Sequence, residues 1–177
     1  MFNISEEFVV RFGTIDDIDQ IFDNIQSIKI EMSEQKIAQW PLDKDYPSKE
    51  MIKTDLLNSQ YFILEKNKEY AGSVVLNTIT TPPYSEISWN GKHFLAVHRL
   101  ATVKAFRKDD AGQLLMSFAE EWALAHHQDS IRLDTYSHNR RANKFYQSCG
   151  FTQVGKINLP WMPEQYYCYE KLLSVAD

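Results

Sequence analysis

The chain of 177 residues has few of the features that mark disulfide-bonded, metal-binding or membrane-spanning proteins. It has only two cysteines, Cys149 and Cys168, with no C-x-x-C pair and no histidine at ligand spacing. We therefore expect structural thiols and no metal site. No apolar run approaches the ~20 residues that span a bilayer, and the amino-terminal stretch lacks a signal-peptide core. These absences predict a soluble, cytoplasmic protein that does not associate with membranes.

Two sequence motifs of common enzyme classes are also missing. There is no G-x-x-x-x-G-K-[ST] loop and no G-x-S-x-G turn, which argues against a P-loop nucleotide hydrolase and an α/β-hydrolase. Nineteen basic residues stand against twenty-four acidic ones, a net charge of −5. This balance argues against a broad nucleic-acid surface and suits a cationic amine ligand.

What is present fits one globular domain covering residues 1–177, because 44% of the residues are hydrophobic and 13% are aromatic. Alternating and β-branched segments predict strands at 8–12, 61–65, 70–77, 92–102, 131–136, 151–155 and 166–172. Helical spacing predicts helices at 15–37, 112–126 and 139–148, and another that Ser48 caps, with Ile52, Leu56 and Leu57 on its buried face. The order βααβββαβαββ predicts an α/β (α+β) domain with a mixed central sheet flanked by helices. Parallel strands are expected only in the middle third.

The turn at 107–112 joins a predicted strand to a predicted helix. Backbone N–H groups at such a helix start carry partial positive charge and favour a phosphate, although an ordinary solvated connection would have the same appearance. This turn and two later segments carry recognisable patterns. RKDDAG at 107–112 is similar to the loop R/Q-x-x-G-x-G/A, NRRANKFY at 139–146 to N-x-x-A-x-x-F/L-Y, and a Gly-Phe pair follows at 150–151. With HRLA at 98–101, the chain resembles the GNAT superfamily of N-acetyltransferases over essentially its whole length.

The resemblance implies a single GNAT-like fold that binds acetyl-CoA. Asn139 would reach the pantetheine, or serve only as the N-cap of its helix, or both. Asp110 stands where the family usually has its first glycine, and its carboxylate would weaken rather than abolish binding of the pyrophosphate. The residues that the resemblance assigns to the cofactor are Leu100, Ala101, Thr102, Arg107, Lys108, Asp109, Asp110, Ala111, Gly112, Gln113, Asn139, Ala142 and Tyr146.

For catalysis, the resemblance points to Tyr146 as the general acid that protonates the departing thiolate. The alternative is a half-buried aromatic residue that only packs on the helix. The attacking amine must lose a proton, since a free primary amine is mostly protonated at pH 7. The candidate bases that the sequence leaves open are Glu31, Glu86, His98, Asp134 and water.

Acceptor recognition is expected from the 28–47 segment and the 156–165 loop, which flank the cofactor groove in the family. Trp40, Tyr46, Trp161 and Met162 would form an apolar wall there, or pack as a lid, or make a dimer contact. The resulting hypothesis is an acetyl-CoA-dependent N-acetyltransferase that acts on a primary amine, of a small molecule or a peptide, by direct attack on the thioester. The alternatives are a CoA-binding sensor and a non-catalytic interaction module, and a homodimer stays open.

Overall fold

The computed structural model describes residues 1–80 and 82–174, except for the side chain of Pro82. Thr81, which the sequence places in a loop, and the last three residues of the expected domain lie outside the described residues. The described chain forms an eight-stranded sheet in the order β1-β2-β3-β4-β5-β6-β8-β7. The strands are β1 (Phe2–Asn3), β2 (Phe8–Phe12), β3 (Tyr61–Lys66), β4 (Glu69–Asn77), β5 (Phe94–Thr102), β6 (Ser130–Tyr136), β7 (Thr152–Ile157) and β8 (Tyr166–Leu172).

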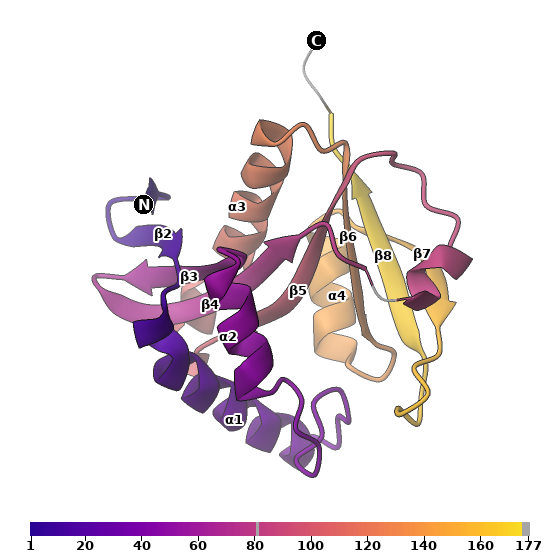
Figure 1. The fold of residues 1–177 in the computed structure, drawn as a ribbon, viewed down its shortest axis with the longest axis horizontal. Coiled ribbons are helices and arrows are strands. Elements are labelled where there is room, and N and C mark those ends of the chain that lie inside the picture. The colour runs from indigo at the N-terminus through magenta and orange to yellow at the C-terminus, as the bar shows by residue number, and fades with distance from the viewer. Residues whose placement is uncertain (81, 175–177) are drawn as a thin grey trace.

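Helices cover both faces of this sheet (Figure 1). The α-helices are α1 (Ile18–Glu34), α2 (Lys49–Leu57), α3 (Ala111–Ala125) and α4 (Arg140–Ser148), and the 3-10 helices are η1 (Ile15–Asp17), η2 (Pro82–Glu86) and η3 (Lys104–Asp109). Apart from the short β1, the order of strands and α-helices is the predicted βααβββαβαββ. Only β5 and β6, joined through α3, pair in parallel; the other neighbouring strands are antiparallel. The fold class and the place of the parallel pair are confirmed. Among the described residues, no helix has both the length and the apolar character needed to cross a membrane.

Alternation along β3 divides the core into two layers. Tyr61 and Ile63 face the helices α1 and α2, while Phe62 and Leu64 face α3 and α4. All four side chains are at most 1% exposed. The two layers hold the helices in fixed positions on opposite sides of the sheet, and this fixes the segments that follow each helix.

Two details of the helices differ from the sequence prediction. The helix expected over 15–37 starts as the 3-10 turn η1 and ends at Glu34. Beyond it, Lys36 has a φ of 58°, and the amides of Lys36 and Ile37 bond the carbonyls of Ser33 and Met32. This is a Schellman closure, and no local pattern indicates it, because its left-handed position is usually a glycine. Leu57, expected on the buried face of α2, is 65% exposed, because the helix ends there and its side chain points to solvent.

The parallel strands β5 and β6 separate partway along their length. They pair only from Phe94 to Ala96, yet β5 continues to Thr102 and β6 to Tyr136. A β-bulge lies in the separated part of β5, where the register with β4 shifts and Arg99 adopts a φ of 49°. The far half of β5 therefore has no ladder partner on its β6 side within the described residues, which leaves an open wedge in the sheet.

Candidate active site

Two cavities meet at the wedge between β5 and β6. The first, of about 450 Å³, lies among α1, the end of β5, the turn before α3 and helix α4. The second, of about 490 Å³, lies among the segment after α1, β5, β6 and the loop between β7 and β8. Both volumes are in the range of small-molecule sites. Four residues belong to the walls of both cavities: Gln39, Trp40, Leu100 and Tyr146.

Most of the residues predicted to contact the cofactor line the first cavity. They are Leu100, Thr102, Arg107, Asp110, Gly112, Gln113, Asn139, Ala142 and Tyr146. Four predicted residues do not line it. Ala101 and Ala111 are buried in the two core layers, Lys108 is exposed, and Asp109 makes an ion pair with Lys66 of β3 at 2.9 Å. Ala101 lies on β5 and packs in the core layer of α1 and α2, and the other three lie in or directly after the 3-10 turn η3.

The turn before α3 offers fewer free amides than the sequence suggested. Residues 104–109 form η3, and the amide of Asp110 bonds the carbonyl of Phe106. The first bond of α3 that follows runs from the Leu114 amide to the Asp110 carbonyl at 2.9 Å. The amides at 111–113 therefore precede the helical ladder, and they are the ones positioned to attract an anion. Asp110 has a φ of 57°, the left-handed conformation that a glycine adopts without strain.

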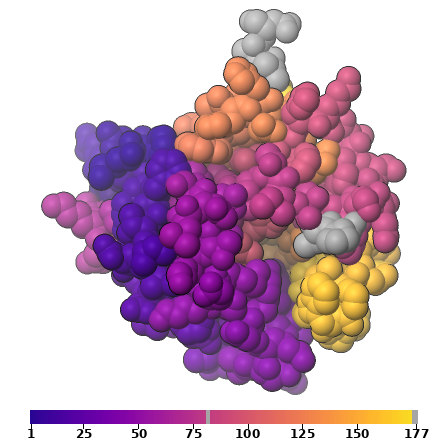
Figure 2. All heavy atoms as spheres, viewed as in Figure 1, coloured from indigo at the N-terminus to yellow at the C-terminus, as the bar shows by residue number. Residues whose placement is uncertain are grey.

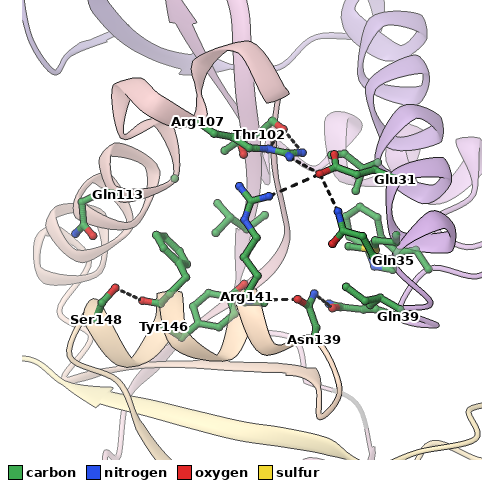
Figure 3. Close-up of a pocket in the computed structure, with 18 of the residues that line it drawn as sticks. Glu31, Gln35, Gln39, Thr102, Arg107, Gln113, Asn139, Arg141, Tyr146 and Ser148 are labelled. Atoms are coloured by element: carbon green, nitrogen blue, oxygen red, sulfur yellow. Dashed lines mark hydrogen bonds and ion pairs between the residues drawn. The ribbon is translucent and has the colours of Figure 1, made fainter.

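Two arginines reach into the first cavity and meet one carboxylate. Arg107 donates to Glu31 at 2.7 Å and to the Thr102 carbonyl at 3.3 and 3.4 Å, while Arg141 lies 3.7 Å from Glu31 (Figure 3). The hydrogen bond from Arg107 lowers the pKa of Glu31, although partial burial acts against it. Sequence reasoning did not assign Arg141 to the cofactor, although it stands inside the NRRA motif. No local sequence pattern indicates that Glu31 pairs with Arg107 across the cavity, because the two residues are 76 positions apart.

Asn139 is the N-cap of α4, as one of the two sequence interpretations held. Its Oδ1 accepts a hydrogen bond from the Ala142 amide at 3.1 Å. Its Nδ2 donates to Gln39 Oε1 at 2.6 Å, which ties α4 to the segment that follows α1 (Figure 3). The residue is buried, so both bonds stabilise the shared wall of the cavities.

Tyr146 projects from α4 into that shared wall. The residue is only 8% exposed, and its hydroxyl bonds no other residue in the described part of the chain. Burial raises the pKa of Tyr146, and the nearby charge of Asp134 raises it further. The side chain is therefore a protonated phenol at neutral pH, with its hydrogen-bonding capacity unused.

The second cavity contains all four residues expected to form an apolar wall, namely Trp40, Tyr46, Trp161 and Met162. The segment after α1 and the loop after β7, which carry them, lie on the same face of the molecule (Figure 2). Of the four candidate bases, His98 and Asp134 also line this cavity. Glu31 lines the first cavity, and Glu86 is exposed on η2 and lines neither.

The two candidate bases of the second cavity have opposite pKa shifts. Burial and the neighbouring Arg99 lower the pKa of His98 to about 4. Its Nε2 lies 3.1 Å from Asn77 Oδ1 and 3.0 Å from the Ile79 carbonyl, so the neutral ring donates from Nε2 and leaves Nδ1 as an acceptor. Burial raises the pKa of Asp134, which accepts a hydrogen bond from the Tyr84 hydroxyl at 2.5 Å.

A buried ion pair between strands β6 and β8 holds the segment that carries Tyr84. Glu170 of β8 accepts from the amides of Asn90 at 2.8 Å and Gly91 at 3.1 Å, and from Arg132 Nε at 3.3 Å. Arg132 and Glu170 are 7% and 3% exposed. Through these bonds the 82–91 segment is fixed to β6 and β8, and Tyr84 is brought to Asp134.

Comparison with known proteins identifies the class to which this fold and site belong. The family model described as "Acetyltransferase (GNAT) family" matches residues 25–151, from α1 to the start of the final hairpin. The chain belongs to the GNAT acetyltransferase family.

Among solved structures, the chain is similar to a GNAT-family acetyltransferase from Streptococcus agalactiae 2603, with a TM-score of 0.80 and 22% identity over 94% of this chain and 96% of that one. A GNAT-family acetyltransferase from Listeria monocytogenes 4b F2365 has a TM-score of 0.74 and 22% identity over 94% and 95% of the chains. Ard1 from Thermoplasma volcanium has a TM-score of 0.72 and 16% identity over 95% and 99%. At these identities the likeness extends to the fold alone. A search of curated proteins gave no match.

Proposed function

We propose that the protein transfers an acetyl group from acetyl-CoA to a primary amine. The observation that carries this proposal is the meeting of two cavities at Tyr146, a buried phenol with a free hydroxyl. The two reactants can then approach one point from opposite sides. Bringing them together in the correct orientation accounts for a large part of the acceleration of such a reaction.

The first cavity has the features that acetyl-CoA requires. The unpaired half of β5, from Val97 to Thr102, can hydrogen-bond the pantetheine amides as an added strand would. The free amides at the start of α3, with Arg107 and Arg141, suit the pyrophosphate. Acetyl-CoA supplies an acyl group that is already activated, so no covalent enzyme intermediate is needed. The residues have only to bind, orient and move protons.

Tyr146 is proposed as the general acid that protonates the departing sulfur. In water a phenol, with a reference pKa of ~10, is a weak acid toward a thiolate of pKa ~8.5. The burial that raises the pKa of Tyr146 also disfavours a thiolate in the same surroundings, so both groups prefer their protonated forms there. The free hydroxyl of Tyr146 is thus suited to donate at the moment the C–S bond breaks.

Asp134 is the proposed general base. Its raised pKa makes it a stronger base than an ordinary carboxylate, whereas His98, with a pKa of about 4, is a weak one. Glu31 is a still weaker candidate, because its pKa is lowered and its carboxylate is held by Arg107. Replacing Asp134 by asparagine is expected to lower kcat/KM about 10²-fold, and His98→Asn less than about tenfold. Steady-state assays of thiol release measure both.

The pH profile gives this assignment a second test. The carboxylate is the active form, so turnover is lost as the pH falls through the pKa of Asp134, which lies above the ordinary value of 3.8. The acid limb of kcat is therefore expected above that value, and it should disappear in Asp134→Asn. Glu86→Gln, the matched control at an exposed acid outside both cavities, should behave as the wild type. An acid limb near pH 4 that survives in Asp134→Asn would assign the base to His98.

Asp110 is expected to weaken acetyl-CoA binding. It lines the first cavity, it is exposed, and a carboxylate near a pyrophosphate costs about 1 kcal/mol at the dielectric constant of water. Asp110→Gly should tighten the dissociation constant of acetyl-CoA about fivefold in isothermal titration calorimetry, since it removes this charge and suits the left-handed backbone.

Two further variants isolate the charge in this experiment. Asp110→Asn keeps a side chain that tolerates a positive φ and should recover most of the gain. Asp109→Asn removes the same charge from the neighbouring position, whose carboxylate pairs with Lys66 outside the cavity, and should change little. Equal affinities for Asp110→Gly and the wild type would show that the carboxylate does not face the pyrophosphate.

A CoA sensor without turnover is the second candidate. It is favoured by Asp110 in the cavity wall and by Glu31, which occupies the two arginines that would otherwise face the phosphates. A thermal shift with acetyl-CoA distinguishes a CoA-binding protein from an interaction module that has lost the cofactor. Thiol release with a panel of amines then distinguishes the enzyme from the sensor.

A further inference from the structure

The wall of the second cavity contains one partly buried carboxylate, that of Asp134, whose charge no cation among the described residues balances. Arg99 and Asp55 pair with each other in its wall, and the ammonium of Lys44 is largely exposed. Asp134 makes no ion pair in the described part of the chain and accepts a hydrogen bond only from the Tyr84 hydroxyl. Partial burial of an unpaired carboxylate has a free-energy cost, and a cationic ligand would reduce that cost.

This carboxylate stands close to the place where the proposed reaction occurs. The charge of Asp134 is near enough to raise the pKa of the Tyr146 phenol. An ammonium group held by Asp134 would therefore arrive beside the general acid. Since Asp134 is also the proposed base, the same contact would bind the ammonium and take its proton.

One part of the cavity wall is mostly aromatic and consists of Trp40, Tyr46, Leu159, Trp161, Met162 and Tyr166. The wall also contains polar side chains, among them Gln39, Lys44, Asn77, His98 and Arg99. The only other acid of the wall among the described residues, Asp55, is already paired, so a second ammonium on the ligand would lose its water without gaining a counterion. A carboxylate beside the amine would lie next to Asp134 and be repelled by it, and it would gain a counterion only by reaching Arg99 or Lys44 elsewhere in the wall. The mouth of the cavity also exposes Trp161, at 64%, and Ile79, at 60%.

We propose that the acceptor is a primary monoamine carried on a bulky apolar group, preferably an aromatic ring. The inference rests on the proposed function and names the class of substrate that the second cavity would bind. The ammonium binds Asp134 and the ring lies against the aromatic wall. The N–C bond forms as the C–S bond breaks. Of the two protons that the ammonium loses, one leaves through Asp134 to solvent and the other offsets the proton that Tyr146 gives to the sulfur.

Four amines test this selectivity. Phenethylamine has the proposed features; ethylamine lacks the ring, phenylalanine adds a carboxylate and spermidine adds ammonium groups. We expect kcat/KM for phenethylamine to exceed each of the others about tenfold or more, because only it buries an apolar ring without a second charge. Calorimetric binding of phenethylamine to the protein with CoA present provides a readout that does not depend on turnover.

Trp161→Ala tests the wall, and the exposure of Trp161 makes the variant safe for folding. It should raise both the dissociation constant and the KM for phenethylamine about fivefold and leave the KM for ethylamine unchanged. Leu57→Ala, at an equally exposed apolar residue outside both cavities, is the matched control. If Trp161→Ala changes the KM for both amines by the same factor, or changes the oligomeric state in gel filtration, the aromatic wall does not determine acceptor selectivity.

The outcomes separate this inference from the proposed function. A preference for spermidine, phenylalanine or ethylamine overturns the inference and leaves acetyl transfer in place. Binding of phenethylamine that depends on Trp161, without turnover of any amine, overturns acetyl transfer and supports the proposed amine selectivity of the second cavity. If no amine in the panel binds or is turned over, both are overturned.

Discussion

Replacing Tyr146 by phenylalanine is expected to lower kcat about 10²-fold while the KM for acetyl-CoA stays within about twofold. The substitution removes one oxygen atom and keeps the ring in the shared wall of the two cavities. Because the hydroxyl bonds no described residue, its loss leaves no protein partner unsatisfied, and the fold should keep its stability. Stopped-flow or steady-state detection of free thiol measures the change in kcat.

A matched control variant tests whether the loss of any tyrosine hydroxyl lowers kcat. Tyr167→Phe removes a hydroxyl from β8, at a residue that lines neither cavity and packs partly buried against the core. It should keep the wild-type kcat. Wild-type turnover in Tyr146→Phe at saturating acetyl-CoA would remove Tyr146 from the mechanism and leave it a packing residue.

Glu170→Gln is expected to destabilise the fold by about 3–5 kcal/mol, the usual effect of removing one partner of a buried ion pair. The new amide would face Arg132 and the backbone amides of Asn90 and Gly91, which are all donors. For a domain of this length, the melting temperature should fall by about 6–20 °C. Calorimetry measures it at pH 7, and Glu121→Gln on the exposed face of α3 is the control, with little change expected.

The same carboxylate predicts a dependence of stability on pH. Burial pushes the pKa of Glu170 upward, but the hydrogen bonds from Asn90 and Gly91 and the charge of Arg132 outweigh it, so the pKa lies below its ordinary value of 4.5. A depressed pKa adds stability above the unfolded value, and this stability is lost as the pH falls through the folded value. The difference between wild type and Glu170→Gln should therefore shrink on acidification below pH 4.5. A difference that is constant from pH 7 to pH 3 would contradict the assignment.

The parts of the fold that were predictable depend on short-range patterns. The order of elements, the parallel pair and the N-cap at Asn139 follow from apolar spacing and from residues close in sequence. The predicted end of α1 was wrong, because Lys36 takes the left-handed backbone conformation that a glycine usually marks in the sequence. The exposure of Leu57 depends on where α2 ends relative to the sheet, and no local pattern contains that information.

The candidate site divides in the same way. Nine of the thirteen residues predicted to contact the cofactor line the first cavity, because the end of β5, the start of α3 and helix α4 all border it. The candidate bases could be ranked only from the structure, because Glu31 pairs with Arg107 and Asp134 with Tyr84, 76 and 50 residues away in sequence. Such long-range pairs leave no periodic trace in a single sequence.

The shared wall of the two cavities has a kinetic consequence. Gln39, Trp40, Leu100 and Tyr146 border both cavities, and beyond them each cavity has lining residues of its own. On the proposed assignment, each substrate has its own compartment, so the donor does not have to leave before the acceptor enters. The catalytic cycle then passes through a ternary complex, and the free coenzyme and the acetylated amine depart without crossing each other's path.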